Sequence, residues 1–424
     1  MTAPSRPDRE DLVPDPTDPT TPLAGVRVLD LSRMLPAGAL TQLLADLGAD
    51  VVKVERPGAG EESRTHGPPV AGTTATHAFL DRGKSSVALD LKDPRGVRAV
   101  RALAARSDVV VESFRPGVAD RLGVGWEDLR AVNPALVYCS VNGYGTGGPR
   151  EQEPGHDLDY LAYAGALGFG GSRQHGPAVG GIQAADLLGG LTGGIGLLAA
   201  LLAVRAGAPG RHVEVGLADA ALWALGLHVS GWLAGGGAEG PESTAVTGAT
   251  PSYRVYACAD GRHLAVGAVE PHFWAAFVGV LGRPELRERQ HDPAAIDEVA
   301  AVLATRSLAA WLVALEGHET CVAPVQTFAE VRDDPQFRAR QMLVPVPGDP
   351  RTEQVGSPVR LDGRAGRPLR RAAPVVGQDA PTVLAAVDVD DDVLAAARAW
   401  STGRAAPPPV PAPVPIPALQ EDPA

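Results

Sequence analysis

The sequence is poor in aromatic residues and in cysteine, and both shortages exclude classes of protein. Phe, Trp and Tyr make up only 4% of its 424 residues, whereas 50 are glycine. Hydrophobic residues still reach 45%, enough for a large core in two domains. The three cysteines, Cys139, Cys258 and Cys321, are widely spaced and form no CxxC pair. We therefore expect no disulfide framework and no metal site, and a reducing, cytoplasmic location.

The sequence also lacks a surplus of basic residues, because its formal net charge is −12. An acidic chain has no electrostatic reason to bind nucleic acid, so we predict no such partner. A local basic patch could still bind a small anion. The first 22 residues contain no apolar segment typical of a signal peptide.

Only one stretch, Leu187–Val204, is apolar enough to raise the question of a membrane. It is 18 uncharged residues long, at the lower limit for a transmembrane helix. Five glycines interrupt it, and Asp186 and Arg205 flank it directly. We interpret it as a buried core helix and predict no membrane partner. A membrane-anchored protein is the alternative.

Proline and glycine patterns divide the chain. We expect disorder at 1–22 and in the Pro/Ala-rich tail 405–424. Between them we predict a large domain at 23–224, a small domain at 225–330, and a return to the large domain at 331–404. The small domain should be α+β, with a hairpin turning at Asp260–Gly261.

The large domain begins with a βαβ pattern. "GVRVLDLS" (25–32) is typical of a strand, 36–49 of a helix with Pro36 at its start, and 50–58 of the next strand and its exit loop. Further strands are expected at 85–91, 108–114 and 134–145, with a helix at 93–107. This alternation predicts a Rossmann-like, doubly wound parallel sheet that binds its ligand beyond the strands' carboxyl ends.

One glycine motif matches a dinucleotide-binding pattern but lacks the structural context that this pattern requires. "GYGTGG" (143–148) fits GxGxxG and follows a strand, but "PREQEPG" comes next and cannot start a helix. A dinucleotide site needs that helix N-terminus beneath the pyrophosphate. We interpret 143–148 as a turn or a loop beside a ligand.

Three polar residues stand in Gly/Ala-rich surroundings: His156 in "GHDLDY", Asp186 in "AADLLGG" and Glu270 in "GAVEPHFW". Each alone has an ordinary structural explanation. His156 could be hydrogen-bonded in a loop, Asp186 could be the N-cap of the apolar helix, and Glu270 could cap the helix after Pro271. Together they fit a proton-transfer site, although spacing alone does not bring them together.

Several longer stretches resemble the class III CoA-transferase family (CaiB/BaiF type), and most closely its α-methylacyl-CoA racemase branch. The resemblance spans about residues 23–345 in the same order. The matching stretches are "GVRVLDLSRMLPAGALTQLLADLGADVVKVERPG", "RGKSSVALDLKDPRG", "SDVVVESFRPGVADRLGVGWEDL", "NPALVYCSVNGYGTGGPR", "GHDLDYLAYAGAL", "ADLLGG", "ADGRHLAVGAVEPHFW" and "CVAPVQTFAEVRDDPQFRAR".

The resemblance implies a Rossmann-like large domain, a small domain, and a homodimer of two interlocked chains. It implies an acyl-CoA substrate and no cofactor besides the CoA of that substrate. The CoA contacts it implies are Arg56, Leu89, Asp90, Leu91 and Lys92, with the backbone around Gly155 and Asp157. Arg82, Lys84 and Arg115 are also close to these motifs, as further cations for phosphate or as ordinary surface charges.

Two mechanisms fit the resemblance. In a racemase, His156 and Asp186 are the two bases that flank the α-carbon of a 2-methylacyl-CoA, and Glu270 orients His156. In a CoA-transferase, Asp186 is the nucleophile that forms acyl and thioester intermediates. His156 and Glu270 favour the racemase. The glycines 235–237 resemble a glycine-rich loop of formyl-CoA transferases, although a linker explains them equally. A third interpretation is a non-catalytic acyl-CoA-binding protein.

Overall fold

The computed structural model describes residues 21–237, 239–365 and 371–402, and the chain divides into two compact units. The large unit comprises the described residues of 21–154, 186–220 and 338–402, and the small unit comprises those of 155–185 and 221–337. This division places 155–185 with the small unit, whereas the sequence assigned them to the large domain. The segments for which we predicted disorder, 1–22 and 405–424, lie outside the described residues except for 21 and 22.

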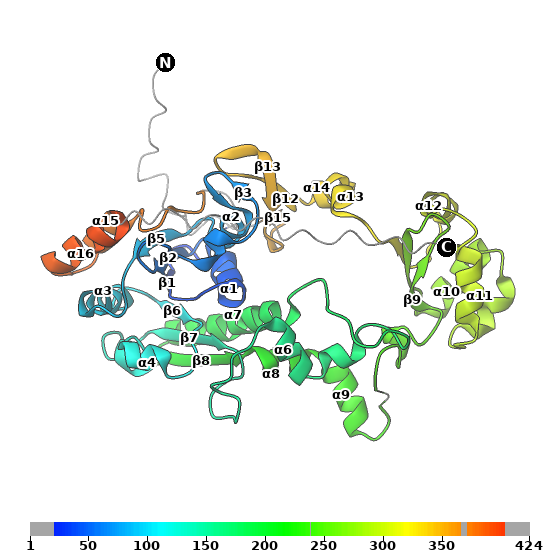
Figure 1. The fold of residues 1–424 in the computed structure, drawn as a ribbon, viewed down its shortest axis with the longest axis horizontal. Coiled ribbons are helices and arrows are strands. Elements are labelled where there is room, and N and C mark those ends of the chain that lie inside the picture. The colour runs from blue at the N-terminus through cyan, green and yellow to red at the C-terminus, as the bar shows by residue number, and fades with distance from the viewer. Residues whose placement is uncertain (1–20, 238, 366–370, 403–424) are drawn as a thin grey trace, which may run out of the picture. The chain divides into compact units, whose positions relative to one another are not determined.

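The large unit contains the predicted alternation of strands and helices (Figure 1). Its first half comprises β1 (Arg27–Asp30), α1 (Leu35–Asp46), β2 (Asp50–Glu55), β3 (Pro69–Val70), β4 (Thr73–Thr74), α2 (Ala75–Leu80), β5 (Ser85–Ala88), α3 (Pro94–Ala104), β6 (Val109–Glu112), α4 (Val118–Leu122), α5 (Trp126–Arg130) and β7 (Val137–Asn142). Later come α7 (Ala184–Arg205), β8 (Arg211–Gly216), the first residues of α8 (Leu217–Ala224), β12 (Leu343–Val346), β13 (Asp349–Val355), β14 (Arg360–Leu361), β15 (Arg364–Ala365), α15 (Ala380–Ala385) and α16 (Asp391–Thr402).

Six strands form one parallel sheet in the order β5-β2-β1-β6-β7-β8. This is the doubly wound order in which the chain reverses its direction of winding after the first central strand. The parallel α/β sheet predicted from the sequence is thus confirmed. The reversal places the topological switch point between β1 and β6, and a ligand crevice is expected beyond their carboxyl ends.

Helices cover both faces of this sheet. One face packs in a core with α3, α5, α15 and α16, and includes Leu29, Val110 and Tyr138. On the other face α7 lies directly against α1. A Cβ at Gly190 of α7 would lie only 2.2 Å from the Pro36 carbonyl oxygen, so this close approach requires glycine.

The small unit is built on a three-stranded antiparallel sheet in the order β11-β10-β9. The hairpin turn at Asp260–Gly261 is confirmed, with φ +73° at Gly261. Trp274, Phe277 and Trp311 are buried beneath the sheet. The elements are α6 (Asp157–Tyr163), α9 (Gly226–Leu233), β9 (Tyr253–Ala257), β10 (His263–Gly267), α10 (Pro271–Val280), α11 (Ala295–Leu303), α12 (Leu308–Leu315), β11 (Val322–Pro324) and α13 (Phe328–Asp333), and α14 (Pro335–Ala339) leads into the large unit.

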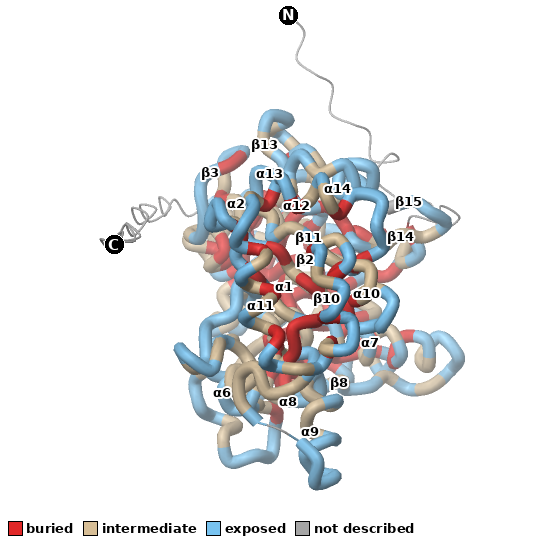
Figure 2. The backbone as a smooth tube through the Cα atoms, turned by 90° about the vertical axis from the view of Figure 1, so that its right-hand side faces the viewer, coloured by how far each residue is buried: buried red, intermediate tan, exposed pale blue. Residues whose placement is uncertain are grey.

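The long apolar helix α7 is less buried than a core helix should be. It has the length and composition of a membrane span, a test that core helices of soluble proteins also pass. Only 39% of its most apolar window is buried. Helix α9 contains only half-buried and exposed residues, and the last residues of α8, 222–224, are exposed (Figure 2). The interpretation of α7 as a core helix rather than a membrane span stays a prediction, and part of the helix surface is exposed in the single chain.

Candidate functional site

The switch point of the sheet is formed by the loops that follow β1 and β6. The backbone N–H of Arg33, in the first loop, donates to the Ser113 hydroxyl of the second at 2.8 Å. The two loops therefore lie side by side at the carboxyl edge of the sheet. In doubly wound proteins this is where the ligand binds.

Most of the predicted CoA contacts directly follow two neighbouring strands: Arg56 follows β2, and Leu89, Asp90, Leu91 and Lys92 follow β5. Glu55 pairs with Ala88 in the sheet, and the Leu89 N–H donates to the Glu55 carbonyl at 2.9 Å. Arg56 and Leu89 therefore leave the same edge together. Leu89 is buried, Asp90 and Leu91 are half-buried, and Arg56 and Lys92 are exposed. These two cations have the accessibility that phosphate recognition needs.

Two more exposed cations stand at the same edge. Arg33 follows β1 and Arg115 follows β6, one on each side of the switch point. Arg33 pairs with Glu62. Sequence reasoning missed Arg33, although its place directly after the first strand was a usable signal. Exposed cations thus follow four adjacent strands: β5, β2, β1 and β6.

Arg82 and Lys84 do not belong to this group. Both side chains are buried, so they are neither candidate phosphate ligands nor surface charges. Arg82 donates to both carboxylate oxygens of Asp46, at 3.2 and 2.8 Å. Lys84 lies 3.1 Å from Asp30 and 3.1 Å from Asp81. Burial of a charge requires partners of opposite sign, and only the folded chain reveals them.

Lys84 belongs to a buried charge cluster beneath the switch point, with Asp30, Lys53, Glu61 and Asp81. Burial alone would raise the pKa of Asp30, but Lys53 and Lys84 outweigh it and hold that pKa well below its usual range. Burial would likewise lower the pKa of Lys53, but the carboxylates around it raise it. Asp30 and Lys53 are therefore ionised at neutral pH, and their pairing anchors the end of β1.

The three candidate catalytic residues all stand at helix N-termini. His156 is the N-cap residue of α6 and Glu270 that of α10, and both are exposed residues of the small unit. The N–H of His156 donates to the Asp159 carboxylate at 2.9 Å, and the Tyr160 hydroxyl donates to the Gly155 carbonyl at 2.6 Å. Helix α6 thus fixes the backbone around the candidate base.

Asp186 lies in the large unit, where it is half-buried. The sequence suggested that it is the N-cap of the apolar helix, but α7 begins at Ala184, and Asp186 is the third residue of its first turn. A carboxylate in the first turn of a helix still lies in the positive field of the helix N-terminus. That the three residues form one site stays a prediction.

The glycine motif at 143–148 is not followed directly by a helix. After β7, residues 143–150 form bends that end in a turn, and the next helix, α6, begins only at Asp157. This arrangement lacks the helix that a dinucleotide motif requires. Glycines 235–237 follow α9 and directly precede residue 238, which is outside the described residues.

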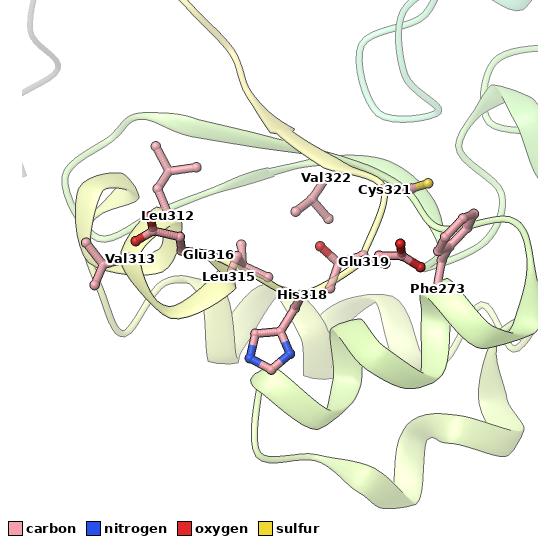
Figure 3. A pocket seen from close by; sticks show the side chains of 10 residues that line it. Phe273, Leu312, Val313, Leu315, Glu316, His318, Glu319, Cys321 and Val322 are labelled. Carbon is pink, nitrogen blue, oxygen red and sulfur yellow. The ribbon is translucent and has the colours of Figure 1, made fainter.

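Two cavities lie within the small unit, and none of the candidate catalytic residues lines either. One of about 720 Å³ (Figure 3) lies between α12, α10 and β11 and is lined by Phe273, Leu312, Val313, Leu315, Glu316, His318, Glu319, Thr320, Cys321 and Val322. The other, of about 500 Å³, begins at Pro271, next to Glu270. Two carboxylates in the lining of the first cavity, Glu316 and Glu319, make it a poor site for an anionic ligand.

No group of three or more His, Cys, Asp or Glu residues that could hold a metal ion occurs in the described part of the chain. The described cysteines, Cys139, Cys258 and Cys321, are free thiols. Burial raises the pKa of the Cys139 thiol to about 12. This thiol is therefore unreactive at neutral pH.

The fold defines a doubly wound α/β protein with exposed cations at the carboxyl edge of its sheet. The profile of "CoA-transferase family III" matches residues 23–380, and the chain belongs to this family. Its members include CoA-transferases and racemases, so the chain is an enzyme. The prediction of the family is thus confirmed.

Relatives of both kinds are equally similar. The succinyl-CoA:glutarate CoA-transferase of Mus musculus is 33% identical over 330 residues, 75% of each chain. The acetyl-CoA:oxalate CoA-transferase of Acetobacter aceti is 33% identical over 85% of this chain and 94% of the relative. The α-methylacyl-CoA racemase of Homo sapiens is 34% identical over 73% and 79%.

A solved structure of the same family has a similar fold. A CaiB/BaiF family protein from Brucella suis has a TM-score of 0.75 and 29% identity. The match covers 87% of this chain and 100% of that protein.

Proposed function

We propose that the protein racemises or epimerises a 2-methylacyl-CoA by α-proton transfer between two bases. The observation that supports this choice is the set His156, Asp186 and Glu270, each at the N-terminus of a helix. A transferase needs only the carboxylate, whereas a racemase uses all three residues. The similarity to α-methylacyl-CoA racemases is in line with it.

In this mechanism His156 removes the α-proton of one enantiomer and Asp186 returns a proton to the opposite face. The roles reverse for the other enantiomer. The C–H bond breaks to give an enolate of the thioester, whose oxygen gathers the negative charge. Backbone N–H groups in the first turn of α7 are suited to stabilise it. Glu270 orients His156 and stabilises its protonated form.

The CoA part of the substrate binds at the switch point. Arg56 and Lys92 contact its phosphates, together with Arg33 and Arg115. The CoA of the substrate is the only cofactor-like group required. We also propose a cytoplasmic protein that is bound to neither membrane nor nucleic acid, which subcellular fractionation tests.

The second candidate is a CoA-transferase, favoured by the equal similarity of transferases from mouse and Acetobacter. Here the Asp186 carboxylate attacks the thioester carbonyl, CoA leaves, and an acyl anhydride forms on Asp186. The CoA thiolate then attacks the Asp186 carbonyl of the anhydride, which releases the donor acid and leaves CoA on Asp186 as a thioester. The acceptor carboxylate attacks this thioester and CoA leaves again. Attack of CoA on the acceptor carbonyl of the new anhydride releases the product acyl-CoA and restores the Asp186 carboxylate. This route gives His156 and Glu270 no required role.

We further propose that two copies of the chain interlock as a homodimer. Large apolar residues along α7, α8 and α9 are between 48% and 77% exposed in the single chain: Leu191, Ile195, Leu202, Leu222, Trp223, Leu227, Trp232 and Leu233. Exposed apolar surface of this extent is typical of a protein interface. Light scattering on the purified protein should give twice the chain mass, and Trp223→Glu should lower it. A monomeric wild type would refute the dimer.

The two activities are separated by the variants His156→Ala and Asp186→Asn. Enantiopure (S)-2-methylbutanoyl-CoA is incubated with each variant, and the product is resolved on a chiral column. The same variants are offered succinyl-CoA with glutarate or oxalate. We expect Asp186→Asn to lose both activities and His156→Ala to lose only racemisation. Loss of CoA transfer in a correctly folded His156→Ala would contradict this assignment.

A further inference from the structure

The loop between β1 and α1 contains a strained residue. Met34, its last residue, has φ 56° and ψ −153°. This backbone conformation is easily reached only by glycine, because a Cβ atom clashes with the backbone there. A non-glycine residue stays in it only when its surroundings hold it, and such residues gather at functional sites.

Every residue of the loop is held by a hydrogen bond. The Met34 N–H donates to Oε1 of Glu61 at 3.0 Å. The Arg33 N–H donates to the Ser113 hydroxyl at 2.8 Å, and the Ser32 N–H to the Asp30 carboxylate at 2.9 Å. The Leu31 N–H donates to the Val111 carbonyl at 2.8 Å. The side chain of Glu61 is therefore the acceptor for the strained residue itself.

Glu61 is in turn anchored by the buried charge cluster. It is 7% exposed, and its Oε2 lies 3.5 Å from Nζ of Lys53. The same Lys53 ammonium donates to the Ser32 carbonyl at 2.5 Å. One lysine thus holds both the loop and the carboxylate that fixes Met34. A buried charged acceptor with a paired cation keeps one position, whereas an exposed side chain would sample several rotamers.

We propose that Glu61 is a positioning residue for the acyl-CoA site: it holds Met34 in the strained conformation so that the β1–α1 loop lines the switch-point crevice before substrate arrives. This role rests on the proposed binding of acyl-CoA at the switch point. Preorganisation lowers the cost of ordering a loop on binding, so its loss raises KM more than it changes kcat.

The test compares Glu61→Ala with the double variant Glu61→Ala/Met34→Gly. Removing the acceptor frees Met34 to leave its strained conformation, and we expect KM for 2-methylbutanoyl-CoA to rise about tenfold, with kcat within about twofold. Glycine adopts the same φ and ψ without an anchor. The KM of the double variant should therefore lie only about threefold above that of the wild type, which is half of the tenfold rise on a logarithmic scale. Hydrogen exchange of the Leu31–Leu35 backbone should accelerate in Glu61→Ala.

Asp46→Asn is the matched control. It weakens a buried ion pair with Arg82 at the opposite end of α1, so it should lower stability and leave KM unchanged. An unchanged KM in Glu61→Ala, no recovery with Met34→Gly, or an equal rise in Asp46→Asn would each overturn the role of Glu61. Titration calorimetry with free CoA separates the two proposals. A wild type that binds no CoA refutes the proposed function and this role together, whereas equal CoA affinity in wild type and Glu61→Ala refutes this role alone.

Discussion

Replacing Glu112 by Gln should stabilise the protein at alkaline pH. Glu112 ends β6 and is 5% exposed. Burial raises the pKa of its carboxyl to about 7 from 4.5, outweighing hydrogen bonds from Ser140 and from the Phe114 N–H at 2.7 Å, while Asp120 and Glu214 raise it further. At roughly 1.4 kcal/mol for each pKa unit, ionisation of Glu112 lowers the free energy of unfolding by about 3 kcal/mol.

The raised pKa of Glu112 determines how the stability of the protein changes with pH. The folded protein binds this proton more tightly than the unfolded chain, so stability falls as the pH rises from about 4.5 to about 7. A glutamine keeps the oxygen that accepts from Phe114 and never ionises. We therefore expect Glu112→Gln to be more stable than wild type by about 2–3 kcal/mol at pH 8 and by less than about 1 kcal/mol at pH 5.

The assay is urea unfolding of both proteins at pH 5 and pH 8, followed by circular dichroism. Glu127→Gln, which replaces an exposed carboxylate of the same unit, is the control and should show no such difference between the two pH values. A Glu112→Gln protein that is equally or less stable than wild type at pH 8 would refute the reasoning.

Further predictions concern packing and the ligand. Lys84→Met should destabilise the protein by about 3–5 kcal/mol, measured by urea unfolding, because it leaves two buried carboxylates with less compensation. Gly96→Ala should cost more than about 1 kcal/mol in the same assay, since its Cβ would lie 2.1 Å from the Asp90 carbonyl oxygen; wild-type stability would contradict that contact. Arg56→Ala should weaken CoA binding about tenfold in calorimetry, more at low salt than at high salt, whereas equal affinity would exclude a phosphate contact.

The sequence predicted the large sheet well because local patterns determine it. Alternation of apolar strands with an amphipathic helix at Pro94–Ala104 suffices to predict βαβ units, and right-handed crossovers then leave few topologies. The hairpin at Asp260–Gly261 was equally visible, because its turn requires φ above zero.

Features that depend on tertiary partners were not visible. Arg82 and Lys84 were interpreted as cations for phosphate or as surface charges, because their partners Asp46 and Asp30 lie 36 and 54 residues away in sequence. Lys84 has a second partner, Asp81, only three residues away. The strained Met34 also has no sequence signature, since its anchor Glu61 is 27 residues away. Asp186 was predicted at the correct helix but at the wrong position in it, because Gln183 and Ala184 offer no cap signal.

The most direct test of the proposed function is α-proton exchange. Purified protein is incubated with (S)-2-methylbutanoyl-CoA in D2O without any acceptor acid, and the α-position is followed by mass spectrometry and NMR. We predict deuterium uptake together with loss of optical purity. A wild type that takes up no deuterium while transferring CoA to an added carboxylic acid would contradict two-base proton transfer and establish a transferase.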